Sequence, residues 1–209
     1  MPSTLESRFR ENLERVHNLI ELYERLCPDS KTPDIQETDL LRASVVLLHA
    51  CVEDLLRTIA ADRLIHRPQV LSTIPFPGDD MYRVKFTLAD LARTYGGRRV
   101  DEVLKDAVLA YLGRRAYNNT DDIASALGEA GLPPSLVAAH ASDLNILMKR
   151  RHHVVHRLDR DEEPGSAVAV LGAINVVRVR RWFEHVEAFG LSVVQHLETL
   201  AGPSEESEA

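Results

Sequence analysis

The residues with the clearest chemical potential lie in one short segment, KRRHHVVHRLDR, at positions 149–160. It carries five lysines and arginines against one acid, Asp159, and three of the nine histidines of the chain. The cations favour a phosphate-bearing ligand. The histidines can give or take a proton near pH 7, which a purely basic patch cannot do. The segment therefore predicts a phosphate-binding site that is able to move protons.

The spacing within this segment decides which side chains can act together on a helix. His152 and His156 are four residues apart and share one face. Arg151 precedes His156 by five residues, which is about 140° around the helix, so its Cβ points elsewhere. Its long guanidinium could still reach the same cleft, or a cleft formed with a second chain. Val154 and Val155 give the helix an apolar side, so we expect the histidine face at a core edge or an interface.

Helices must position this segment, because helical signals run along the whole chain. Leucine and alanine, both strong helix formers, are abundant, and apolar residues recur at steps of three and four. We expect helices over residues 4–27, 39–65, 87–95, 100–112, 120–131, 135–158 and 166–200, and loops at 29–36 and 66–80. The stretch 168–177 is rich in β-branched residues and could be strand on propensity alone. The helical stripe that follows it favours a helix from 166 onward.

The helix expected over residues 39–65 is the most strongly patterned. Its apolar stripe is wide enough for a helix that packs on more than one side. Two acidic residues, Glu53 and Asp54, interrupt this stripe. Such residues are usually the polar edge of a core helix, but Glu53 is also a candidate for the site.

Length and composition indicate one globular domain, here residues 1–201, followed by a disordered acidic tail at 202–209. The chain has 209 residues, of which 44% are hydrophobic and 27% charged, which excludes disordered, fibrous and membrane proteins. No apolar run is long enough to span a bilayer, and the N-terminus lacks the apolar region of a secretory signal. We expect a cytoplasmic protein. The net charge of −7 argues mildly against coating nucleic acid, but it allows a local basic site.

The motif and the helix order resemble those of HEPN domains. Arg151-His152-x-x-x-His156 resembles their Arg-x4–6-His motif, in which a polar residue commonly follows the arginine. The string RRHHVVHRLDR looks like the RiboL-PSP-HEPN branch, and LLRASVVLLHACVEDLLR is similar to the early core helix of that branch. The resemblance covers residues 5–200. It implies an all-α, HEPN-like helical bundle with a long C-terminal helix.

The resemblance also implies an activity, because many HEPN proteins are metal-independent endoribonucleases in toxin–antitoxin, antiphage or RNA-processing systems. His156 would deprotonate the ribose 2′-hydroxyl or protonate the leaving 5′-oxygen. Arg151 would hold the phosphate and stabilise its developing charge. His152 would orient His156 or contact RNA. The implied partners are RNA, a second copy of the chain that completes a composite site, and a cognate antitoxin. The resemblance implies neither a cofactor nor a metal ion.

Several assignments stay open at this point. Arg150 and His156 form an equally valid register of the motif, with five residues between them. Lys149, Arg150 and Arg157 are candidates for contacts with the substrate. An acidic residue from another helix often supports such sites, and Glu53 is the candidate by its position in the upstream helix.

Other interpretations compete with catalysis. The chain could be a non-catalytic HEPN-like module that binds RNA, a nucleotide or a partner protein. The basic segment could also be a solvated helix face. His152 and His156 could bind zinc with a third ligand, but the chain has no HExxH motif and the flanking arginines would repel a cation. We expect His49 and His140 to be structural histidines, and the two cysteines to be inert core residues.

Overall fold

The helix α2 (Ile35–Arg63) lies at the centre of the fold in the computed structural model, which describes residues 3–28, 34–74, 88–161 and 170–201. It packs against α1 (Thr4–Leu26), α5 (Val100–Arg114), α6 (Thr120–Glu129), α7 (Ala141–Arg157) and α8 (Val176–Ala201). Its buried residues cover about half of its circumference at about 100° per residue, which is wider than the stripe of a helix packed on one side. The prediction that this helix packs on more than one side is therefore confirmed.

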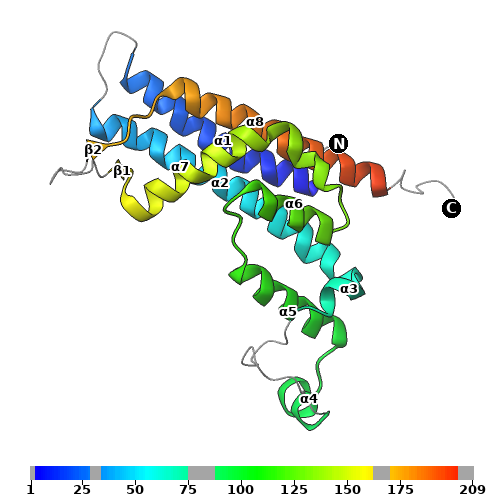
Figure 1. The fold of residues 1–209 in the computed structure, drawn as a ribbon. Coiled ribbons are helices and arrows are strands. Elements are labelled where there is room, and N and C mark those ends of the chain that lie inside the picture. Colours follow the sequence, from blue (N-terminus) through cyan, green and yellow to red (C-terminus); the bar gives the residue numbers. More distant parts are fainter. Residues whose placement is uncertain (1–2, 29–33, 75–87, 162–169, 202–209) are drawn as a thin grey trace.

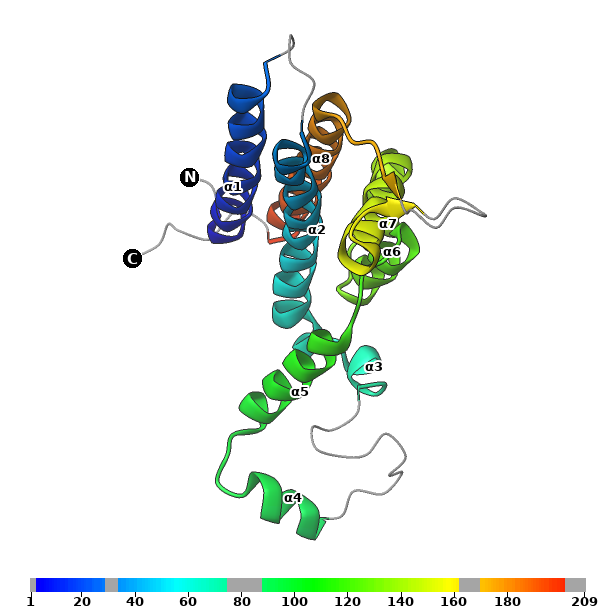
Figure 2. The ribbon, with the colours of Figure 1, turned by 90° about the vertical axis from the view of Figure 1, so that its left-hand side faces the viewer.

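The long helices α1, α2, α7 and α8 run beside one another as a bundle, with α6 next to α7 (Figures 1 and 2). The remaining elements are α3 (Pro68–Leu71), α4 (Leu88–Tyr95), the 3₁₀ helices η1 (Leu64–His66) and η2 (Pro134–His140), and the strands β1 (Arg160–Asp161) and β2 (Val170–Leu171). Apart from this two-residue antiparallel pair, all regular secondary structure in the described residues is helical, so the predicted all-α class is confirmed.

One apolar core joins the bundle helices. It includes Phe9 and Ile20 of α1, Leu48 and Leu55 of α2, and Phe189 of α8, all of them buried. At the far end of α2, α5 packs through a smaller buried cluster that consists of Ala60, Leu64, Val108 and Leu112. α4 lies furthest from the bundle (Figure 2). None of the helices in the described ranges is both long and apolar enough to cross a membrane.

The helices α2 and α7 start at other residues than expected. α2 begins four residues earlier than predicted, because Asp34 and Glu37 form a capping box inside the expected loop. The Asp34 carboxylate accepts from the Glu37 amide at 2.8 Å, and the Glu37 carboxylate accepts from the Asp34 amide at 2.9 Å. The helix expected from residue 135 is α-helical only from Ala141, since η2 occupies its first turns.

The expected start of the last helix is wrong over residues 170–175. Val170 and Leu171 pair with β1, as the β-branched composition of this stretch allows, and the helix begins at Val176. The Asn175 side chain accepts the Arg178 amide at 2.9 Å and caps the helix there. Residues 162–169, part of the predicted turn and helix start, and the predicted tail at 202–209 lie outside the described residues.

Candidate functional site

The KRRHHVVHRLDR segment forms the second half of α7 and the turn that follows it. Leu144, Leu147 and Met148 bury the other side of α7 in the core. The helix ends in a left-handed turn, with φ of 50° at Leu158 and 57° at Asp159, and the Asp159 amide donates to the His153 carbonyl at 3.1 Å. This turn directs Asp159 inward.

His152 and His156 form an exposed pair on α7, as the i, i+4 spacing predicts. Their ring centroids lie 4.6 Å apart, and the His153 ring is 6.5 Å from that of His152. Partial desolvation, and then the neighbouring His156, His153 and arginine charges, lower the pKa of His152. The lowered pKa favours the neutral form of His152 near pH 7, in which its ring can accept a proton.

Arg151 points to the interior side of α7, toward α2. It is half-buried, and its Nε is fully enclosed with no hydrogen-bond acceptor among the described residues. Its positive charge helps to lower the pKa of buried His49 of α2. Within one chain, Arg151 and His156 therefore point away from α7 in different directions, as their spacing predicts.

His49 connects this region to the α5–α6 loop. Its Nε2 donates to the Tyr117 carbonyl oxygen at 2.7 Å, and its Nδ1 lies 3.9 Å from a carboxylate oxygen of Glu53. Burial lowers the pKa of His49, with Arg151 and Arg57 adding to the effect. His49 is thus a neutral, hydrogen-bonded histidine at neutral pH, in line with the structural role expected for it.

Glu53, the predicted acidic support, lies on the α2 face that carries His49. It is partly exposed and has Arg57 3.8 Å from its carboxylate, besides His49. The charges of Arg151 and Glu53 both affect the pKa of His49, which Arg151 lowers and Glu53 raises. The structure thus brings Glu53 to the Arg151 side of α7 and not to the exposed His152–His156 pair.

Arg150, the alternative arginine of the motif, belongs to a buried ion cluster. Its guanidinium donates to Asp159 at 2.5 Å and to the Gly172 carbonyl at 2.9 Å. Arg42 of α2 donates to the same carboxylate at 2.8 Å and the same carbonyl at 3.1 Å. Arg150 therefore ties the end of α7 to α2 and β2. The sequence signal for this cluster was Arg42, a charge inside the apolar stripe of α2.

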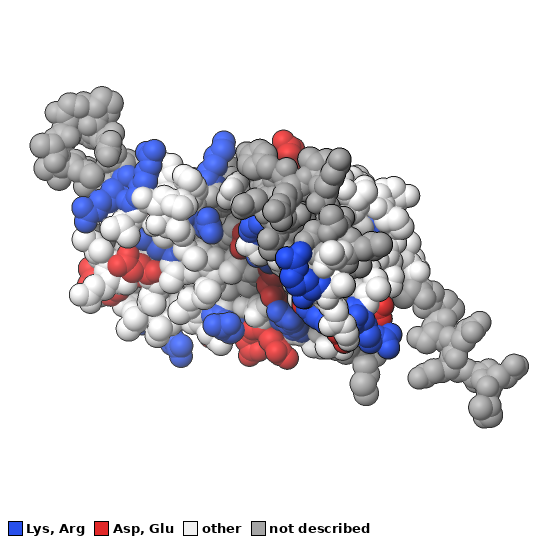
Figure 3. Space-filling view, turned by 90° about the horizontal axis from the view of Figure 1, so that it is seen from below, with Lys and Arg blue, Asp and Glu red and all other residues white. Residues whose placement is uncertain are grey.

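Lys149 and Arg157 are exposed, and neither has an acidic partner within the described ranges. Arg160 of β1 is exposed as well. In the view from below, lysine and arginine side chains lie at the left-hand end of the molecule and right of its centre, with acidic side chains next to both groups (Figure 3). The basic segment therefore keeps a cationic surface even though Arg150 is neutralised.

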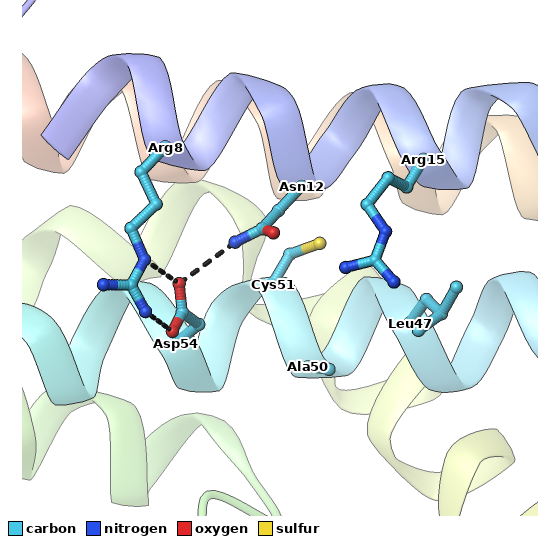
Figure 4. A pocket seen from close by; sticks show the side chains of 7 residues that line it. All are labelled: Arg8, Asn12, Arg15, Leu47, Ala50, Cys51 and Asp54. Atoms are coloured by element: carbon cyan, nitrogen blue, oxygen red, sulfur yellow. Dashed lines mark hydrogen bonds and ion pairs between the residues drawn. The ribbon is translucent and has the colours of Figure 1, made fainter. Parts of the chain in front are cut away.

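A separate pocket of about 220 Å³ lies between α1 and α2 (Figure 4). Asp54 accepts from Arg8 at 2.9 Å and from Asn12 at 3.0 Å, so these two donors are already engaged. Burial raises the pKa of the Cys51 thiol there to about 11, which keeps it protonated and a poor nucleophile. The residues of α2 that line this pocket lie on the side away from His49, at about 100° per residue.

Two further observations bear on the site. The described residues contain no cluster of three histidine, cysteine, aspartate or glutamate side chains that could hold a metal ion. Comparison with models of protein families, with curated proteins and with solved structures found no match for this chain.

Proposed function

We propose that this chain is a metal-independent endoribonuclease of the HEPN type that acts in a toxin–antitoxin, antiphage or RNA-processing system. The observation that carries the proposal is the exposed His152–His156 pair, with ring centroids 4.6 Å apart, on a helix rich in cations. Two imidazoles within reach of one phosphodiester supply the base and the acid that strand cleavage needs.

The chemistry follows from that pair. Neutral His152, whose pKa is lowered, accepts the proton of the ribose 2′-hydroxyl, and the 2′-oxygen attacks the adjacent phosphorus. The bond from phosphorus to the 5′-oxygen breaks, and protonated His156 gives that oxygen its proton. The products are a 2′,3′-cyclic phosphate and a free 5′-hydroxyl. Arg151 stabilises the charge that builds on the phosphoryl oxygens.

The proposed site includes two chains, because Arg151 and His156 leave α7 about 140° apart. A twofold dimer would bring the α7 of one chain against that of its partner, so that half-buried Arg151 of one chain and exposed His156 of the other border one cleft. The exposed apolar residues Val155 and Leu158 on and just after α7 support such an interface.

The test is cleavage of labelled RNA in excess EDTA by the wild type, by His156→Ala and by His66→Ala. His66 is an exposed histidine of η1, far along the chain from α7, and serves as the matched control. We expect the wild type and His66→Ala to leave cyclic-phosphate ends, and His156→Ala to lose cleavage while keeping its helicity and its mass in solution. Undiminished cleavage by His156→Ala would refute the assignment.

A second candidate is a non-catalytic module that binds RNA, a nucleotide or a partner protein through the same basic helix. The divergence of Arg151 and His156 within one chain favours it. RNA retention without cleavage by the wild type, weakening steeply with salt, would identify this function instead.

A further inference from the structure

A groove of about 240 Å³ lies between α7 and α8, next to the histidine pair. Its lining residues are Ile146, Lys149, Arg150, His153, Arg178 and Trp182. No carboxylate is among them, Trp182 is buried, and Ile146 is an exposed apolar side chain. The groove therefore combines an apolar floor with cationic edges.

The arginines at the start of α8 have different partners. Arg180 donates to Glu24 of α1 at 2.7 and 2.5 Å, and Arg181 lies 2.8 Å from Asp143. Arg178 is exposed and has no acidic partner among the residues that the structure describes. The same holds for Lys149 across the groove. These two cations are available to a ligand, whereas Arg180 and Arg181 are neutralised.

The groove is continuous with the proposed catalytic face. Lys149 and His153 are four residues apart on α7 and so share one side of the helix. The His153 ring lies 6.5 Å from that of His152, which in turn contacts the His156 ring. A polymer that crosses the histidine pair would next meet Lys149 and Arg178.

We propose that this groove binds the phosphodiester backbone of the RNA strand beside the cleavage point, an inference that rests on the proposed function. Phosphate oxygens accept hydrogen bonds from Lys149 and Arg178, and the exposed part of Ile146 packs on a sugar. Arg150 lines the groove, but its charge is neutralised by the ion pair with Asp159. The contacts are to the backbone, so they set affinity and strand position without selecting a base.

The probe is a labelled 12-nucleotide, fully 2′-O-methylated single-stranded RNA, which lacks the attacking hydroxyl and is not cut. Its dissociation constant is measured at several salt concentrations for the wild type, for Lys149→Ala/Arg178→Ala and for the control Lys105→Ala/Arg114→Ala. The control removes the same residue types from exposed positions on α5, at the far end of α2. Both double variants therefore have the same net charge.

We expect the groove variant to bind about tenfold more weakly at 0.15 M salt, and its salt slope to fall by about 1.4, the value for two lost single-strand phosphate contacts. The control should match the wild type. Equal binding by all three proteins, or equal weakening of both variants, would overturn the groove assignment.

Cleavage of unmodified RNA, measured in parallel, separates this inference from the proposed function. If the wild type cuts RNA and the probe binds independently of Lys149 and Arg178, the groove assignment alone is wrong. If the wild type neither cuts nor binds, both proposals fail. A labelled hexaglutamate peptide is the alternative ligand, and if it binds through Lys149 and Arg178 while RNA does not, the groove serves a protein partner.

Discussion

Replacing Asp159 by asparagine should destabilise the fold strongly, although it changes one atom of the side chain. Asp159 is 2% exposed, and it lies 2.8 Å from Arg42 and 2.5 Å from Arg150. The Arg42 side chain is itself only 8% exposed. Asparagine tolerates the left-handed backbone at this position, so the loss of charge is the main change.

The expected cost follows from burial. Removing one partner of a buried ion pair costs about 3–5 kcal/mol, because the remaining charge stays desolvated. Arg42 keeps Asp39 at 3.2 Å, and water reaches part of Arg150, so we expect the lower end, about 3 kcal/mol. For a chain of this length that corresponds to a fall in Tm of roughly 6–12 °C.

The assay is urea unfolding followed by helicity at pH 7.5, with Asp39→Asn as the matched control. Asp39 pairs with the same arginine, but its side chain is 60% exposed, so its loss should cost at most about 1 kcal/mol. Equal costs for the two variants, or a cost below about 1 kcal/mol for Asp159→Asn, would refute the view that burial makes this cluster important.

Three further predictions concern stability. Burial lowers the pKa values of His49 and His140 in the folded chain, so their contribution is present above an unfolded pKa of about 6.5 and is lost as pH falls below it. The Tm should therefore fall between pH 7.5 and 5.5, and less so in His49→Gln; a Tm that rises on acidification would contradict this. Leu158→Gly should raise the free energy of unfolding in urea by about 0.5–1 kcal/mol. Leu158 has a left-handed backbone with a φ of 50°, which glycine adopts without strain, and its side chain is 71% exposed. No gain would mean that the turn is unstrained. Gly190→Ala should lower the free energy of unfolding by about 1–3 kcal/mol, although alanine favours helices. The reason is that a Cβ at this position would overlap the Phe9 ring. A more stable variant would disprove the close approach of α1 and α8.

Local sequence signals predicted the helices well and their starts less well. The apolar stripe of α2 predicted a helix packed on several sides, since periodicity depends only on neighbouring residues. The last helix was extended too far back, because β-branched residues at 168–177 suit both a strand and a helix, and the pairing of Val170 and Leu171 with β1 decides between them.

The sequence by itself determined the histidine pair of the candidate site. His152 and His156 meet because residues four apart on any helix share a face, whatever surrounds it. Which cations remain available was decided only by the tertiary structure. Arg150 is neutralised by Asp159 from the turn after α7, and Arg181 of α8 is neutralised by Asp143 of α7. Packing brings no described acidic side chain to Arg178. Charge partners across a fold depend on packing, and no local pattern encodes that.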